Sequence, residues 1–154
     1  MLIEEFIPYG ELTVCVIGNA PPVAFPAIQR PLDPATRLSC HVLTSTPSRW
    51  ECPLELDGSL DVQARRIALK MFEAIGCRDV ARVDLRVDER GRLYFLEINP
   101  LPSFDPEGSL GLLAEYLGTR YDDLVGRILR AAVERLSRPS SPASHPLGAR
   151  AERR

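Results

Sequence analysis

Lysine is almost absent from this chain of 154 residues: of its 19 lysine and arginine residues, only Lys70 is a lysine. Long apolar runs are absent too, since no stretch approaches the roughly 18 residues that a membrane-spanning helix needs. The first residues, MLIEEF, hold acids where a secretory signal carries basic side chains, so we expect a soluble, cytoplasmic protein. The net charge of -2 gives no electrostatic reason to expect nucleic acid or an anionic membrane as a partner.

Paired cysteines and neighbouring histidines are also lacking. The four cysteines form no C-x-x-C pair, and His41 and His145 lie far apart, so a zinc site is not expected. We expect reduced thiols with mainly structural roles. A chain of this length can bury roughly two thirds of the surface that its unfolded form exposes, which favours one domain.

The amino-terminal third of the chain predicts strands. The stretches LIEEFI (residues 2–7) and ELTVCVIG (residues 11–18) are apolar, and the turn-forming PYG between them indicates two neighbouring strands. Residues 18–53 are rich in proline and weakly periodic, and RLSCHVLT (residues 37–44) is the only strand that we expect there.

Helical periodicity appears in the remainder of the chain. It predicts helices at residues 60–75, 110–117 and 122–136. The expected boundary residues are Ser59, Ser109 and Asp122 as amino-terminal caps and Gly76 as a stop. Proline, serine, alanine and arginine dominate residues 137–154, so we expect a disordered tail after a single domain of residues 1–136.

The segment VARVDLRVDERGRLYFLEIN contains two alternating runs and predicts a β-hairpin over residues 80–98, with its turn around Asp88 and Gly91. We expect its apolar face to pack on the helix of residues 60–75. The side chains expected in that contact are Val83, Leu85, Leu96 and Ile98.

The other face of this hairpin is charged. Arg82 and Asp84 point the same way along the first strand, and Glu97 and Asn99 share a face of the second. A loop centred on residues 89–90 would place Arg82 opposite Glu97, with Asp84 diagonal to Glu97. Two carboxylates and an amide oxygen that converge in this way suit Mg²⁺. Spacing alone leaves a second interpretation equally open, in which this is a solvated face whose charges pair across the strands.

The stretches EEFIPYGELTV and ARVDLRVDERGRLYFLEINPLP, with the SL that follows, closely resemble the carboxy-terminal half of D-alanine:D-alanine ligases and related ATP-grasp carboxylate-amine ligases. The resemblance covers residues 2 to about 136, and its most specific part is R-x-D followed, one hairpin later, by E-x-N-x-x-P. It implies an α+β fold, the carboxy-terminal lobe of an ATP-grasp, with a largely antiparallel sheet backed by helices.

Five residues of the hairpin and its surroundings acquire roles through this resemblance. It implies that Asp84, Glu97 and Asn99 hold the Mg²⁺ or Mn²⁺ ions that bridge the phosphates of ATP. It implies that Arg82 stabilises charge on an acyl phosphate and that Ser109 helps to place the substrate. The chemistry implied is phosphorylation of a carboxylate by ATP, after which an amine displaces the phosphate.

The resemblance also implies a nucleotide site near the amino terminus. Glu4, Glu5, Phe6 and Ile7 match the family's hinge, whose backbone meets the adenine edge, and Glu11 matches the acid that accepts hydrogen bonds from the ribose hydroxyls. Without the rest of the pattern, these residues would be read as an exposed strand and turn.

The chain also departs from the family pattern. The family's amino-terminal domain and its smaller lobe with phosphate-binding lysines have no counterpart here, and residues 18–53 lack the lysine and tyrosine of the family's mobile loop. Arg37 and Arg49 are the candidate replacements, and Ser103 stands where the family has a glycine. We therefore expect a truncated reading frame, one part of a split enzyme or a degraded relative.

Three functions remain open at this point. The chain is part of a ligase, a non-catalytic nucleotide- or partner-binding module derived from one, or an unrelated α+β interaction domain. The first implies as partners a nucleotide, a small amino-acid-like substrate and either a separate amino-terminal half or a second copy of the chain. The R-x-D and E-x-N elements together argue against the third.

We expect the 154-residue chain alone not to sustain ligation. Holding a carboxylate and an amine in line with the γ-phosphate supplies much of the rate of such reactions. The parts of the family that would complete the implied site on one side have no counterpart in this sequence. Incubation with ATP, Mg²⁺ and D-alanine should yield no sustained dipeptide when ADP and dipeptide are followed. Continued dipeptide formation that is lost in Glu97→Gln would contradict this expectation.

Overall fold

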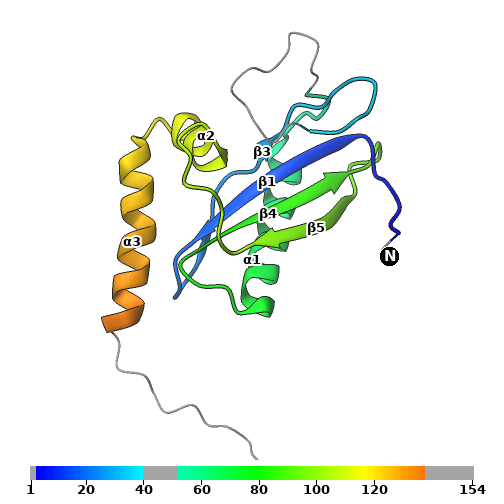
Figure 1. Ribbon diagram of the computed structural model, residues 1–154. Helices are drawn as coiled ribbons and strands as arrows, with labels where there is room; N and C mark the ends of the chain where they lie inside the picture. Colours follow the sequence, from blue (N-terminus) through cyan, green and yellow to red (C-terminus); the bar gives the residue numbers. More distant parts are fainter. Residues whose placement is uncertain (1–2, 40–51, 138–154) are drawn as a thin grey trace, which may run out of the picture.

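The computed structural model describes residues 3–39 and 52–137. It contains a five-stranded sheet with α1 (Gly58–Ile75) packed on one face and α2 (Ser109–Tyr116) and α3 (Tyr121–Ser137) on the other (Figure 1). The α+β class expected from the sequence is confirmed. Within the described ranges, no helix is both long enough and apolar enough to cross a bilayer.

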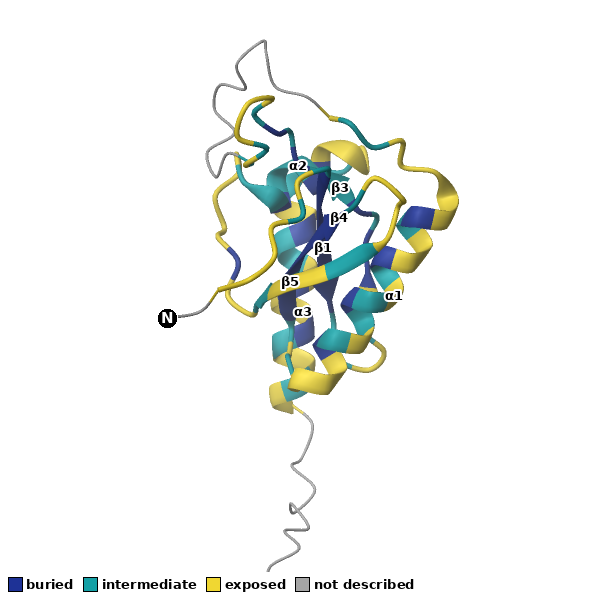
Figure 2. Cartoon of the chain, turned by 90° about the vertical axis from the view of Figure 1, so that its right-hand side faces the viewer, coloured by how far each residue is buried: buried dark blue, intermediate teal, exposed yellow. Residues whose placement is uncertain are grey.

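The sheet is built around two long central strands. Each pairing among its strands is antiparallel, and the order is β2-β1-β4-β5, with β3 also paired to β1. The strands are β1 (Gly10–Ile17), β2 (Val23–Ala24), β3 (Ile28–Gln29), β4 (Val80–Val87) and β5 (Leu93–Asn99). In Figure 2, β1 and β4 are buried almost throughout, whereas β5 at the edge is half-buried or exposed.

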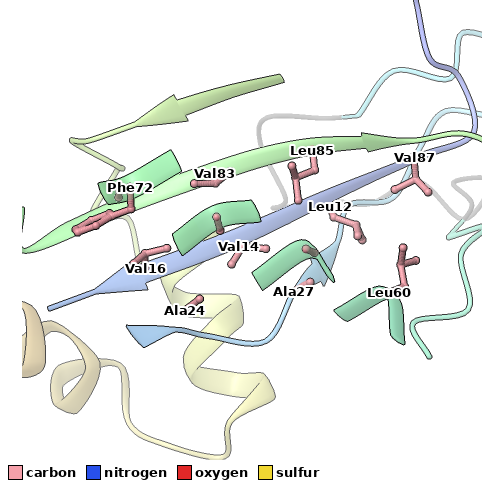
Figure 3. Packing of buried hydrophobic residues seen from close by; sticks show 13 residues of the cluster. Leu12, Val14, Val16, Ala24, Ala27, Leu60, Phe72, Val83, Leu85 and Val87 are labelled. Atoms are coloured by element: carbon pink, nitrogen blue, oxygen red, sulfur yellow. The ribbon is translucent and has the colours of Figure 1, made fainter. Parts of the chain in front are cut away.

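The larger core lies between the sheet and α1 (Figure 3). Strand alternation turns every second side chain of β1 and β4 toward the helix, and Phe72 of α1 packs among them. Each large side chain buried there contributes about 1.5 to 3 kcal/mol to folding. The strand residues of this core include Leu12, Val14, Val16, Val83, Leu85 and Val87.

The first helix begins earlier than the sequence predicted. Its N-cap is Asp57 rather than Ser59, because the Asp57 carboxylate accepts a hydrogen bond of 2.7 Å from the backbone N–H of Leu60. The predicted stop at Gly76 is confirmed, since this glycine takes the left-handed conformation with φ 74° that ends many helices.

The predicted hairpin is confirmed as β4 and β5, but its predicted register is wrong. Asp84, not Arg82, lies opposite Glu97, and Arg82 lies opposite Asn99. Two steps of one residue each cause the shift. The turn is centred on Arg90, since Val87 pairs with Leu93. A bulge then leaves Leu96 as an extra residue on β5, because Leu85 pairs with Phe95 while Asp84 pairs with Glu97.

The bulge also explains why one packing prediction failed. Val83 and Leu85 are fully buried against α1, and Ile98 packs at the edge of the same core, as expected. Leu96 is 50% exposed, because the extra residue of a bulge leaves the regular alternation. The assignment of Leu96 to the buried face was therefore wrong.

The apolar stretch at the amino terminus is not a strand. Residues 3–7 have no regular structure, and the backbone oxygen of Ile7 accepts a hydrogen bond from the Arg86 side chain rather than from a neighbouring strand. Of the strand predicted at residues 37–44, only the first part lies in the described ranges, where Ser39 forms an isolated bridge with Leu32. Residues 40–44 lie outside these ranges. Most of the predicted tail, residues 138–154, also lies outside them.

The last two helices occur where periodicity predicted them, with small shifts at their starts. Gly108 rather than Ser109 is the N-cap of α2, and α3 begins at Tyr121, one residue before Asp122. The apolar side chains of α3 are only partly buried: Leu124 and Ile128 lie in the core, whereas Leu129 and Val133 are exposed.

A salt bridge links α3 to the start of β4. The Arg135 guanidinium donates to both carboxylate oxygens of Asp79. Its shortest hydrogen bond is 3.0 Å to Oδ1 and 2.6 Å to Oδ2. Asn19 donates to Asp79 and also to the backbone oxygen of Ala131. The hydrogen bond from Arg135, assisted by that from Asn19, holds the pKa of Asp79 below its ordinary value despite partial burial.

This contact predicts a pH dependence of stability. A carboxyl group whose pKa is lowered by folding stabilises the folded state above its unfolded pKa and loses that effect as the pH falls through the folded pKa. Asp79→Asn should therefore lower the urea midpoint at pH 7, and the deficit should shrink below about pH 4. Asp122→Asn, at a solvated pair with Arg120, is the matched control. Equal deficits for Asp79→Asn at pH 7 and pH 3 would contradict this assignment.

Candidate active site

The face of the sheet turned away from α1 carries a group of charged and polar side chains. They alternate with the core residues of the same strands, so the pattern that turns one set toward α1 turns the other toward this face. They come from three adjacent strands and are Glu11 and Thr13 of β1, Arg82, Asp84 and Arg86 of β4, and Glu97 and Asn99 of β5.

Asp84 lies at the centre of this face. Its carboxylate accepts from the Thr13 hydroxyl at 2.9 Å and from Nε and Nη2 of Arg82 at 3.0 and 2.7 Å. The same Nη2 lies 3.5 Å from Oε1 of Glu97. The cross-strand carboxylates Asp84 and Glu97 therefore lie beside one guanidinium, the first nearly buried and the second 58% exposed.

These carboxylates also determine the charge state of Arg82. Burial disfavours the charged guanidinium, but the hydrogen bond and charge of Asp84, with the charge of Glu97, outweigh burial and raise the pKa of Arg82 above its ordinary value. Arg82 is therefore a permanent positive charge between two acids, able to stabilise negative charge that develops beside it.

Asn99 lies at the end of β5, opposite Arg82. Its side-chain oxygen accepts from the backbone N–H of Leu101 at 3.1 Å, which closes a turn at Pro100. The structure thus brings Asp84 and Glu97 together and places Asn99 two pairs further along the same strands, with its amide oxygen engaged in the turn.

The chemistry of these donors fits a hard cation. No cluster of three carboxylate, histidine or cysteine side chains suited to a metal occurs within residues 3–39 and 52–137. Two carboxylates and one amide are nevertheless enough protein ligands for Mg²⁺, which usually keeps water and phosphate oxygens in its remaining positions. Asp84, Glu97 and Asn99 are the residues that could hold it.

Glu11 is more deeply buried than a surface ligand would be. Arg86 donates to its Oε2 at 2.7 Å, and Ser39 donates to its Oε1 at 2.7 Å. Nε of Arg30 lies 3.4 Å from the same Oε1. Both carboxylate oxygens are therefore engaged, and a ribose hydroxyl would have to share Glu11 with these partners.

The stretch predicted to be a hinge lies next to Arg86. Nε of Arg86 donates to the backbone oxygen of Ile7 at 2.8 Å, and its guanidinium lies 5.0 Å from the centre of the Phe6 ring. Glu4 and Glu5 are exposed. Arg86 thus connects the hinge to the charged face of the sheet.

Neither candidate replacement for a lysine is shown to reach this face. Arg37 donates to the backbone oxygens of Pro8 and Tyr9, so it holds the chain after the hinge. Arg49 lies outside the described residues. Lys70 is exposed on α1, which covers the opposite face of the sheet, as expected for a solvated helix residue.

The predicted substrate residue Ser109 lies close to Arg82. Both line a pocket of about 90 Å³ at the start of α2, together with Arg30 and Ser103. The sequence interpretation missed Arg30 and Thr13. Thr13 could have been found from the alternation of β1, because it shares a face with Glu11.

Cys15 also points to this side of the sheet but belongs to the apolar cluster beneath α2 and α3. Burial raises its pKa to about 12, and the smaller effects of Arg82 and Asp84 oppose each other. A thiol with this pKa is almost entirely protonated at neutral pH, so Cys15 is not suited to act as a nucleophile.

We expect Cys15 to resist alkylation. When the folded chain is treated with iodoacetamide at pH 8 and analysed by peptide mass spectrometry, Cys15 should react far more slowly than the exposed Cys52. In urea the two rates should become similar. Equal rates in the folded chain would show that Cys15 is accessible.

Comparison with protein families gives a match over most of the chain. The family model described as D-ala D-ala ligase C-terminus matches residues 1–130. D-alanine–D-alanine ligase B of Chromobacterium violaceum is 34% identical over 131 residues, which are 84% of this chain and 42% of that protein. D-alanine–D-alanine ligase of Carboxydothermus hydrogenoformans is 34% identical over 137 residues, 87% of this chain and 43% of that protein. The chain thus spans about two fifths of the length of these relatives.

Solved structures show the same fold. The D-alanine–D-alanine ligase from Coxiella burnetii matches with a TM-score of 0.67 and 26% identity, over 86% of this chain and 34% of that one. The ligase from Bacillus anthracis complexed with ATP matches with a TM-score of 0.64 and 24% identity, over 85% of this chain and 39% of that one. The ATP-grasp fold expected from the sequence is confirmed.

Proposed function

Because this chain belongs to the family of D-alanine–D-alanine ligase carboxy-terminal domains, we propose that it is the ATP- and magnesium-binding part of a ligase that joins a carboxylate to an amine through an acyl phosphate. The observation that carries the proposal is the contact of both Asp84 and Glu97 with the Arg82 guanidinium, on the face of the sheet opposite α1.

The metal site of this proposal consists of Asp84, Glu97 and Asn99. A bound Mg²⁺ would neutralise charge on the phosphates of ATP. Arg82, held in place by Asp84, would stabilise the negative charge of the phosphoryl group being transferred. Thr13 fixes the Asp84 carboxylate from the neighbouring strand, so the acid keeps one orientation.

The nucleotide site of this proposal runs along Glu4, Glu5, Phe6 and Ile7 toward Glu11. Arg86 supports it, because this one side chain contacts Phe6, Ile7 and Glu11. The Bacillus anthracis relative was crystallised with ATP, which supports a nucleotide as the ligand of the shared fold. The substrate residue is Ser109, in the pocket that Arg82 also lines.

A second candidate is a non-catalytic nucleotide-binding module derived from such a ligase. It is favoured by the hydrogen bonds that already satisfy Asp84 and by the remote position of Lys70 on α1. Adding the amino-terminal part of a relative in trans separates the two candidates. Dipeptide formation in the mixture would support the ligase, and nucleotide binding without dipeptide would support the module.

We expect the chain to bind ATP only with Mg²⁺ present, and we expect Glu97→Gln and Asp84→Asn each to weaken that binding by at least about tenfold. The reason is that each substitution removes a charged oxygen from the metal site. Isothermal titration calorimetry with ATP, in Mg²⁺ and in EDTA, is the measurement. Glu73→Gln, the same change on the exposed side of α1, is the matched control and should bind as the unmodified chain does. Unchanged affinity in both site variants would rule out this metal site.

A further inference from the structure

Arg30 occupies an unusual place for an arginine. It follows β3 directly, it is only 6% exposed, and it lies on the charged face of the sheet. Its Nε lies 3.4 Å from Oε1 of Glu11, a carboxylate that Arg86 and Ser39 also hold. Because Arg86 and Ser39 hold Glu11 in place, this ion pair restrains the position of the Arg30 guanidinium.

From this position Arg30 reaches the pocket at the start of α2. Arg30, directly after β3, and Arg82 of β4 line the same pocket of about 90 Å³, which has room for one small oxyanion. Ser103 and Ser109 line it as well and can supply hydroxyl donors. A smaller hollow beside it is lined by Arg30, Thr13 and Ser109, so Arg30 lies between β1 and α2.

The start of α2 favours an anion at the same place. The N-cap, Gly108, lines the pocket and has no side chain to accept hydrogen bonds from the first-turn N–H groups. Such groups carry partial positive charge. Among the described lining residues only Asp105 is acidic, and its Oδ1 accepts from the backbone N–H of Glu107.

We propose that Arg30 is a second cationic ligand, beside Arg82, for a phosphoryl group bound in this pocket. Two guanidiniums and two hydroxyls offer more donors than a carboxylate can accept in good geometry, whereas a tetrahedral phosphoryl group presents three terminal oxygens. The inference rests on the proposed function and assigns to that site the residue that follows β3. Arg30 binds the group and Glu11 positions Arg30.

Inorganic phosphate tests this directly. The full 154-residue chain is titrated with phosphate at constant ionic strength, and the dissociation constant is measured from amide chemical shifts. Arg30→Gln should weaken phosphate binding by at least about tenfold, as loss of a charged hydrogen bond does, and Arg30→Lys should weaken it less. Asp105→Asn should tighten it, because it removes a negative charge from the pocket. Arg66→Gln, the same charge change on the exposed side of α1, should have no effect.

The outcomes separate this proposal from the proposed function. Undetectable phosphate binding by the unmodified chain, or an unchanged constant in Arg30→Gln, would overturn the role of Arg30 whether or not ATP with Mg²⁺ binds. Phosphate binding that depends on Arg30, without ATP binding, would support this role while the nucleotide proposal fails. Acetate that binds as tightly as phosphate would contradict the phosphoryl assignment. If Arg30→Gln does not fold, Arg30→Lys and Asp105→Asn decide the question.

Discussion

The antiparallel pairing of β1 with β4 is the interaction on which the rest of this structure depends. Eight consecutive pairs, from Gly10 with Val87 to Ile17 with Val80, hold these strands together at the centre of the sheet. Because side chains alternate along both strands, this single register sends the apolar set to α1 and the charged set to the opposite face. A slip of one residue on either strand would bury charged groups without partners, at a cost of several kcal/mol each. The same strand register therefore determines both the core and the candidate active site.

Much of this arrangement could be predicted from the sequence because it depends on local signals. The hairpin follows from two alternating runs around a turn, and the end of α1 follows from Gly76. The stretch before β1 was wrongly expected to be a strand, because its apolar content does not reveal whether a strand edge is available. Arg30 was missed for a related reason: its segment is rich in proline and too irregular to show which side chains share a face.

The bulge on β5 shows how one residue alters the site. Apolar alternation predicted a regular hairpin, which would place Asp84 diagonal to Glu97. The extra residue, Leu96, together with a turn centred on Arg90, instead puts these two carboxylates directly opposite each other. No local sequence pattern predicts such a bulge, because it depends on how the twisted strands meet. The sequence therefore identified the acids but not their alignment.

Arg86 joins parts of the chain that are far apart in sequence. Its guanidinium contacts the Phe6 ring and donates to Ile7, Glu11 and the backbone oxygen of Arg37. The segment that leads into β1 lacks strand pairing, yet Arg86 connects it to the centre of the sheet, and Arg37 holds it at Pro8 and Tyr9. A ligand that binds along this segment would meet a surface already ordered, and it would lose less of its binding free energy to the entropy of arranging a loop.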